Sequence, residues 1–132
     1  MKTPLIFVTD DEEMITQIVE DGLQILGIQS DLKVEVEVSG DPVEALRLIR
    51  TIRYDLLILD HRMPSIKGSE IAKEIRLGTG PNKETSIIFI SGYIDEAKKE
   101  TRELKDIHYL NKPLIFQNLI SLIQQVLGTK TP

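Results

Sequence analysis

Four short candidate strands in this sequence are each followed, one or two positions later, by side chains that could take part in chemistry. Asp10 and Asp11 follow residues 5–8, Asp60 follows 56–59, Ser91 follows 87–90, and Lys112 lies two positions after 107–110. If these segments are parallel strands of one sheet, their carboxyl ends meet at one edge, where ligands bind in this architecture. The sequence therefore predicts three carboxylates, a hydroxyl and an ammonium group in a common cavity.

Such a group of residues favours phosphoryl transfer. Two unit charges ~4 Å apart at an effective dielectric near 20 interact by about 4 kcal/mol, so Asp10, Asp11 and Asp60 repel one another unless a cation lies between them. Mg2+ suits such a site because it takes a few carboxylate oxygens and keeps positions open for a phosphoryl oxygen. Lys112 supplies a compact positive charge for the same group, and a carboxylate can itself accept the phosphoryl group.

Each residue also has an ordinary structural explanation. The acidic run 10–13 is favourable in the first turn of a helix, Asp60 resembles a cap at the end of a strand, and Lys112 before Pro113 is typical of a solvated side chain. The functional interpretation depends on the coincidence that all of them follow strands of one predicted sheet.

The elements that must position these residues alternate along the chain. Strands are predicted at 5–8, 34–38, 56–59, 87–90 and 107–110, the second near a sheet edge because Val34, Val36 and Val38 alternate with glutamates. Helices are predicted from apolar residues at three- and four-residue spacing. The first helix has Met14 on its buried apolar face and stops at Gly27. The second starts at Asp41-Pro42 and has Val43 on its buried face. The third ends at Gly78, the fourth spans 94–104, and the fifth ends at Gly128. Strict alternation predicts an α/β fold with a doubly wound parallel sheet of five strands, (βα)5.

Composition limits the classes of function. The 132 residues are 41% apolar, with a formal charge of −5 and no cysteine, so we expect a folded domain without disulfides or thiolate metal sites. The acidic balance argues against a nucleic-acid partner, and no apolar run approaches the ~20 residues of a membrane span. We expect one cytoplasmic domain over 1–132, with a core of about 4–128 and a short tail at 129–132.

Four motifs resemble the response-regulator receiver family of two-component signalling, including its chemotaxis regulators. They are Asp10-Asp11, LLILDHRMP at 56–64, IIFISG at 87–92 and YLNKP at 109–113. The resemblance covers essentially the whole chain in order. It implies the flavodoxin-like strand order 2-1-3-4-5.

The resemblance also implies a role for each matching residue. Asp60 would accept a phosphoryl group from a phosphohistidine of a sensor histidine kinase or a histidine phosphotransfer protein, with Mg2+ or Mn2+ bound. The other implied roles are Asp11 as direct metal ligand, Asp10 as ligand through water, the Arg62 backbone carbonyl as metal ligand, Lys112 as phosphoryl contact, Ser91 and Tyr109 as switch residues, and Pro113 as the site of a frequent cis peptide bond.

The implied activity is that of a signalling switch in a two-component or phosphorelay system, not of a metabolic enzyme. It would promote its own phosphorylation and dephosphorylation, and the change at Ser91 and Tyr109 would alter a face that binds a downstream effector protein. With no residues left for an output domain after Gly128, we expect a monomer or weak dimer that acts by binding another protein and has neither a nucleic-acid nor a membrane partner.

Aromatic, charged and histidine side chains lie near the predicted site in the sequence or on the predicted helices. Arg62 and Tyr93 flank the acceptor, and we predict a cation–π pair on the rim that slows hydrolysis, with two independent exposed side chains as the alternative. The dense charges of the fourth helix could form a docking face or simply be solvated. His61 and His108 are expected to be surface residues, because neither has a second histidine at metal-site spacing.

Three other classes of protein share features with this sequence. A flavin-binding domain would need a hydroxyl-rich loop where this chain has acids, and a haloacid dehalogenase-like phosphohydrolase would need an aspartate where Arg62 stands. The remaining alternative is a pseudo-receiver, a binding module that works without phosphorylation. It usually lacks the acceptor, an acid or the lysine, all of which this chain has.

Overall fold

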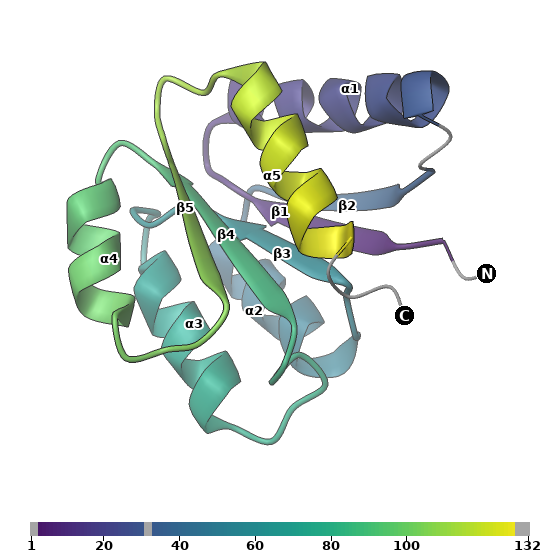
Figure 1. Cartoon of the computed structure of the whole chain (residues 1–132). Helices are drawn as coiled ribbons and strands as arrows, with labels where there is room; N and C mark the ends of the chain where they lie inside the picture. The colour runs from purple at the N-terminus through teal and green to yellow at the C-terminus, as the bar shows by residue number, and fades with distance from the viewer. Residues whose placement is uncertain (1–2, 31–32, 129–132) are drawn as a thin grey trace.

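The computed structural model describes residues 3–30 and 33–128, in which five strands alternate with five helices (Figure 1). The strands are β1 (Leu5–Thr9), β2 (Glu35–Ser39), β3 (Leu56–Leu59), β4 (Ser86–Ser91) and β5 (Ile107–Asn111). The helices are α1 (Glu13–Ser30), α2 (Pro42–Thr51), α3 (Gly68–Leu77), α4 (Ile94–Thr101) and α5 (Phe116–Gly128). The predicted alternation is confirmed. None of the described helices is long and apolar enough to cross a membrane.

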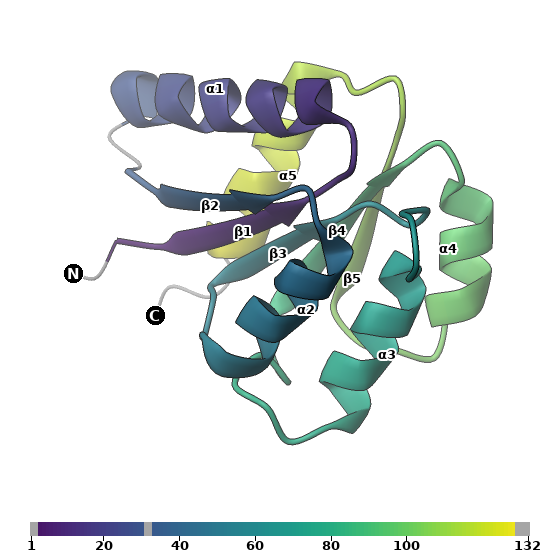
Figure 2. The ribbon, with the colours of Figure 1, turned by 180° about the vertical axis from the view of Figure 1, so that it is seen from behind.

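All neighbouring strands are parallel, in the order β2-β1-β3-β4-β5, which confirms the predicted doubly wound sheet and its order. Helices α1 and α5 cover one face, and α2, α3 and α4 cover the other, as the front and back views show (Figures 1 and 2). Successive side chains of a strand point to opposite faces. Ile6 and Val8 therefore join the core under α1 and α5, while Phe7 joins the core under α2 and α3.

Local sequence explains most of the element boundaries. Asp41 caps α2 by accepting a hydrogen bond from the Val43 backbone N–H, and Pro42 follows at the first helical position, as predicted. Gly78 ends α3, also as predicted. Residues 129–132, the predicted tail, lie outside the described residues.

Three details of the predicted helices are wrong. Helix α1 continues past Gly27 to Ser30, and α4 ends at Thr101 rather than Leu104. Met14 and Val43, expected in buried stripes, are 73% and 66% exposed. Each is the second residue of its helix, so periodicity alone overestimates burial in these first turns.

One glycine is required for the backbone after β3 to fold back beside the strand. Gly68 begins α3, and its N–H donates to the His61 carbonyl at 2.7 Å. A Cβ placed on Gly68 would overlap the carbonyl oxygen of Asp60 and lie 2.7 Å from the Phe89 ring. The absence of a side chain at Gly68 therefore lets α3 approach the end of β3.

We predict that Gly68→Ala lowers the free energy of unfolding by about 1 to 3 kcal/mol, because the new methyl group forces α3 away from β3. Urea unfolding followed by circular dichroism would measure the loss. Gly80→Ala is the matched control, since a Cβ there meets no atom within 4 Å. Equal stability of the two variants would contradict the prediction.

Candidate functional site

Asp60 lies at the carboxyl end of β3, in the middle of the sheet. Its residue is 4% exposed, and its backbone N–H donates to the Thr9 carbonyl at the end of β1. This hydrogen bond continues the β1–β3 ladder by one residue, so the positions after both strands lie side by side. The fold thus brings Asp60 next to the acidic segment after β1.

Asp10 is the buried acid of that segment, with 3% of its surface exposed. Its Oδ1 accepts a hydrogen bond from the Glu12 backbone N–H at 2.8 Å, which fixes the carboxylate at the turn into α1. Its Oδ2 is buried and has no hydrogen-bond partner among the described residues. A buried carboxylate oxygen without an aligned hydrogen bond is costly, so Asp10 Oδ2 is available for a cation.

Lys112 reaches these acids from the end of β5. Its Nζ lies 2.7 Å from Glu12 Oε1, 3.1 Å from Asp10 Oδ2 and 3.3 Å from Asp60 Oδ2. The backbone supports this position, because the Lys112 N–H donates to the Ser91 carbonyl and the peptide bond to Pro113 is cis, as expected. One ammonium group therefore joins three acids that come from two other segments.

Burial sets the protonation of the two central acids. It raises the pKa of Asp10 to about 7, against the hydrogen bond from Glu12 and the charge of Lys112. Burial also raises the pKa of Asp60, against the charge of Lys112 and a hydrogen bond from the Ser91 hydroxyl. For Lys112, burial would lower the pKa, but the bond to Glu12 and the two aspartates raise it above its ordinary value. The ammonium group stays charged, and the negative charge of the acids is only partly compensated.

The donor set fits a hard divalent cation. Carboxylate oxygens of Asp10, Glu12 and Asp60 lie within 4.8 Å of one another, and the unpartnered Oδ2 of Asp10 is among the oxygens at the site. Mg2+ prefers oxygen ligands and few protein carboxylates. A cation would also favour the charged form of both buried aspartates.

Asp11 and Glu12, the other two acids of this segment, lie differently with respect to Lys112 and the buried aspartates. Asp11 is exposed and lies outside that cluster of acids, although its charge acts on Asp60 and raises the pKa of that carboxyl. Glu12, for which the sequence predicts no individual role, provides the shortest contact to Lys112. The sequence did place Glu12 in the acidic run, but its spacing gave no reason to separate it from its neighbours.

Ser91 and Tyr109 are the two predicted switch residues, and both lie on strands next to α4. Ser91 is fully buried at the end of β4, and its Oγ accepts a hydrogen bond from the Tyr93 backbone N–H at 3.0 Å. The Tyr109 ring stacks on Phe89 with centroids 5.9 Å apart, and its hydroxyl forms a hydrogen bond with Thr101. Tyr109 therefore points inward and joins β5 to the last residue of α4.

Arg62 and Tyr93 form a pair on the rim. The Arg62 guanidinium carbon lies 4.4 Å from the centroid of the Tyr93 ring, so the predicted cation–π geometry is present. Arg62 also donates to Glu96 Oε2 at 2.6 Å. The two side chains are held together, rather than being independent exposed groups.

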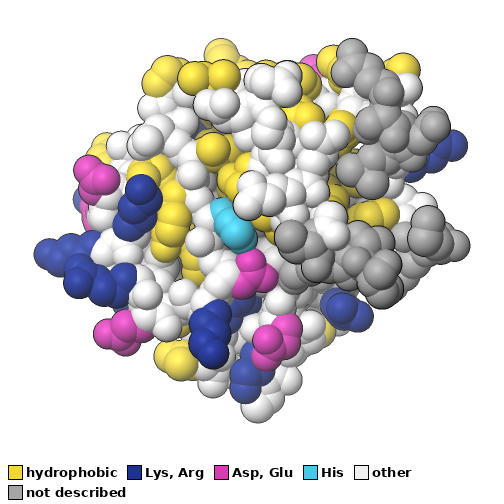
Figure 3. All heavy atoms as spheres, in the orientation of Figure 1, with side chains coloured by type: hydrophobic (Ala, Val, Ile, Leu, Met, Phe, Trp, Pro, Cys, Tyr) yellow, Lys and Arg dark blue, Asp and Glu magenta, His cyan; other side chains and the backbone are white. Residues whose placement is uncertain are grey.

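His61 corrects the expectation of a surface histidine. It is 0% exposed, because α4 packs over the end of β3, and it faces Glu96 and Glu100. His108 is partly exposed, and its Nε2 lies 2.8 Å from Asp106. The space-filling view shows acidic and basic side chains interspersed at the side where α4 lies (Figure 3).

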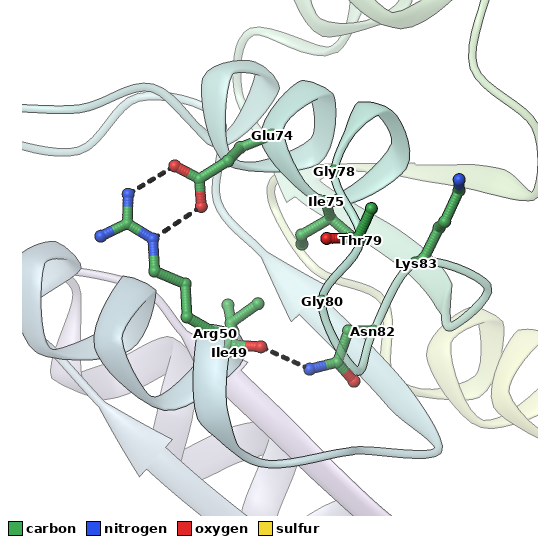
Figure 4. A pocket seen from close by; sticks show the side chains of 9 residues that line it. All are labelled: Ile49, Arg50, Glu74, Ile75, Gly78, Thr79, Gly80, Asn82 and Lys83. Carbon is green, nitrogen blue, oxygen red and sulfur yellow. Dashed lines mark hydrogen bonds and ion pairs between the residues drawn. The ribbon is translucent and has the colours of Figure 1, made fainter.

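A pocket at the other end of the sheet is held together by hydrogen bonds and an ion pair between its lining residues. It is lined by residues of α2, α3 and the connection to β4, where Arg50 pairs with Glu74 and the Asn82 amide donates to the Ile49 carbonyl (Figure 4). The Asn82 side chain also accepts from the Tyr54 backbone N–H. These bonds join loops at the amino ends of β3 and β4, away from Asp60.

Known proteins match the chain over almost its whole length. A family model described as the response regulator receiver domain matches residues 6–124. The sensor histidine kinase AtsR of Burkholderia thailandensis is 30% identical over 90% of this chain and 19% of its own length. The response regulator MprA of Mycobacterium tuberculosis is 28% identical over 96% of this chain and 52% of its own length.

The fold has close structural counterparts. The chemotaxis response regulator CheY4 of Vibrio cholerae superposes with a TM-score of 0.79 at 29% identity, covering 95% of this chain and 99% of that one. By contrast, the chain spans about half or less of the length of the two sequence relatives. The similarity therefore concerns one domain of those larger proteins.

The raised pKa of Asp10 predicts how stability depends on pH without a divalent cation. In the unfolded chain this carboxyl titrates near 3.8, so between about pH 4 and 7 the folded protein binds more protons than the unfolded one. The free energy of unfolding should therefore fall as pH rises through this window. Asp10→Asn removes the contribution of this carboxyl and should stabilise the protein at pH 8 by about 2 to 4 kcal/mol, with little change near pH 4.

Urea unfolding in EDTA at both pH values, followed by circular dichroism, would measure the two differences. Asp21→Asn on the exposed face of α1 is the control and should leave the pH profile as it is. An Asp10→Asn effect of equal size at both pH values would contradict the prediction.

Proposed function

This chain belongs to the response regulator receiver domain family, and from that premise we propose that Asp60 accepts a phosphoryl group in a Mg2+-dependent reaction. The observation that carries the proposal is the position of Lys112 Nζ, 3.3 Å from Asp60 Oδ2 and 3.1 Å from Asp10 Oδ2. A single lysine beside two buried aspartates at the strand ends matches what phosphoryl transfer to a carboxylate needs.

The proposed step is a direct transfer. An Asp60 carboxylate oxygen attacks phosphorus, a P–O bond forms, and the P–N bond of a donor phosphohistidine breaks, with the leaving imidazole taking up a proton. Receiver domains act with histidine kinases, so we propose a sensor kinase or a histidine phosphotransfer protein as the donor. Lys112 holds the transferred oxygens by charge, and burial keeps bulk water from the acceptor.

Mg2+, or Mn2+ in its place, would be held by Asp10, Asp60 and the Arg62 backbone carbonyl, with Asp11 and Glu12 beside them. When bound, the ion neutralises the charge of the acids and of the transferred group. Without it, phosphorylated Asp60 would carry ~1.5 to 2 negative charges next to two acids. The unpartnered Asp10 Oδ2 supports this assignment.

We further propose that the phosphoryl group shifts Ser91 and, through it, Tyr109. The Ser91 hydroxyl lies close enough to Asp60 to lower the pKa of that carboxyl, so it can turn toward added acceptor oxygens. Tyr109 contacts both Phe89 and Thr101, so its movement would change how α4 lies against β5 and thereby a surface for an effector protein. As a signalling domain, the chain would promote its own phosphorylation and slower dephosphorylation.

Incubation with acetyl phosphate and Mg2+ tests the proposal. We expect a mass gain of about 80 Da, one phosphoryl group, by intact mass spectrometry. Asp60→Asn and EDTA should each abolish it, and Asp21→Asn should leave it unchanged. If the wild type gains no mass from acetyl phosphate or from a phosphohistidine donor, the phosphoacceptor role fails and the pseudo-receiver alternative is favoured.

Removal of the rim pair should shorten the lifetime of the phosphorylated form. Arg62 and Tyr93 stack at 4.4 Å beside the site, so replacing both with alanine opens a path for water to the acyl phosphate. We expect several-fold faster loss of the added mass after the phosphodonor is removed. Lys99→Ala, on the exposed side of α4, is the control. An unchanged rate in the double variant would refute the rim role of both residues.

A further inference from the structure

His61 is a buried imidazole that the phosphoacceptor site does not use. It lies directly after Asp60, is 0% exposed, and packs edge-on against Phe89 with centroids 6.2 Å apart. Neither ring nitrogen has a hydrogen-bond partner among the described residues. A buried imidazole without an aligned hydrogen bond is costly, so a nitrogen that faces anionic groups is suited to bind a cation between them.

Two glutamates of α4 face this imidazole. Glu96 and Glu100 are four residues apart, so they lie on one side of the helix. Nε2 of His61 lies 3.3 Å from Glu96 Oε1 and 3.2 Å from Glu100 Oε2. The distances are short enough for hydrogen bonds, but neither oxygen is aligned with the nitrogen, as expected if the nitrogen points between them.

The second oxygen of each glutamate is held by another residue. Arg62 donates to Glu96 Oε2 at 2.6 Å, and the buried Ser69 hydroxyl donates to Glu100 Oε1 at 3.2 Å. Each carboxylate thus keeps one oxygen directed at His61. Such outer hydrogen bonds orient the ligands in metal sites.

The spacing matches a tetrahedral ion. With metal–ligand distances of about 2.0 to 2.2 Å, tetrahedral geometry separates ligands by roughly 3.3 to 3.6 Å. The two measured nitrogen–oxygen distances are 3.3 and 3.2 Å, and all three ligand atoms lie within 4.8 Å of one another. A small movement of the glutamates would complete the set, with water as the fourth ligand.

We propose that His61 Nε2, Glu96 Oε1 and Glu100 Oε2 form a second cation site that takes Zn2+ or a similar first-row ion. The imidazole distinguishes it from the all-oxygen site at Asp10 and Asp60, because nitrogen ligands favour zinc over magnesium. The ion would join the segment after β3 to α4, and its binding does not require phosphorylation of Asp60.

Lys67 provides the positive charge at this site in the structure. Its Nζ lies 3.1 Å from Glu96 Oε1 and 3.6 Å from Glu100 Oε1. The side chain is 44% exposed, so it can turn into solvent when an ion enters. Lys67 and the ion therefore compete for the same two carboxylates, and removing Lys67 should strengthen ion binding.

Co2+ is a suitable probe, because tetrahedral sites with a nitrogen ligand give intense visible absorption while oxygen-only octahedral sites absorb weakly. The titration uses the full chain carrying Asp60→Asn with excess Mg2+, so that the acidic site contributes little. We expect a saturable band that Zn2+ removes. Ser69→Ala should weaken binding by about 10- to 100-fold, and Lys67→Ala should strengthen it.

The two histidines provide matched variants, since the chain has no others. His61→Asn should lose the band and His108→Asn should keep it. Should His61→Asn fail to fold by circular dichroism, Glu100→Gln decides, because its side chain is partly exposed. Absence of a band in the parent protein, or a band unchanged in His61→Asn or, where that variant does not fold, in Glu100→Gln, overturns the proposal.

Discussion

The contact between Lys112 and its three acids is the constraint on which the site depends. Asp10 and Asp60 are 3% and 4% exposed, and two buried carboxylates close together are unfavourable without a compensating charge. Lys112 supplies that charge at 3.1 and 3.3 Å. One ammonium group cannot balance both aspartates and Glu12, so the site retains negative charge and an unpartnered oxygen, which together favour a cation.

Sheet order explains which side-chain lengths appear at which strand end. β1 and β3 are neighbours, so two short aspartates meet directly. β5 is two strands from β3, a span of about 10 Å, and only a long side chain such as Lys112 can reach across. β4 lies between them, where the short hydroxyl of Ser91 suffices to reach Asp60. The residue types are therefore matched to their distances from the acceptor.

The sequence was informative where one strand or helix decides the outcome. Unbroken apolar runs predicted the buried strands, and the residues after them identified Asp10, Asp60, Ser91 and Lys112. It was uninformative where a second element decides burial. His61 follows an acceptor in a charged segment and resembles a surface residue until α4 packs over it. The i, i+4 pair Glu96 and Glu100 was visible among the charges of that helix, but its histidine partner comes from the segment after β3, 35 residues before Glu96.

Helix α4 is held to the sheet by few apolar contacts, which gives its polar contacts a large share of the stabilisation. Its buried residues are Ile94, Ala97 and Thr101. One polar connection runs from Thr101 to Tyr109 on β5, and the other from Glu96 and Glu100 to the segment after Asp60. An element with little buried apolar surface can be displaced by a small free-energy change. Under the proposed function, phosphorylation of Asp60 would act on α4 through the first connection, and an ion at His61 would act through the second. The two effects would be coupled because they bias the position of the same helix.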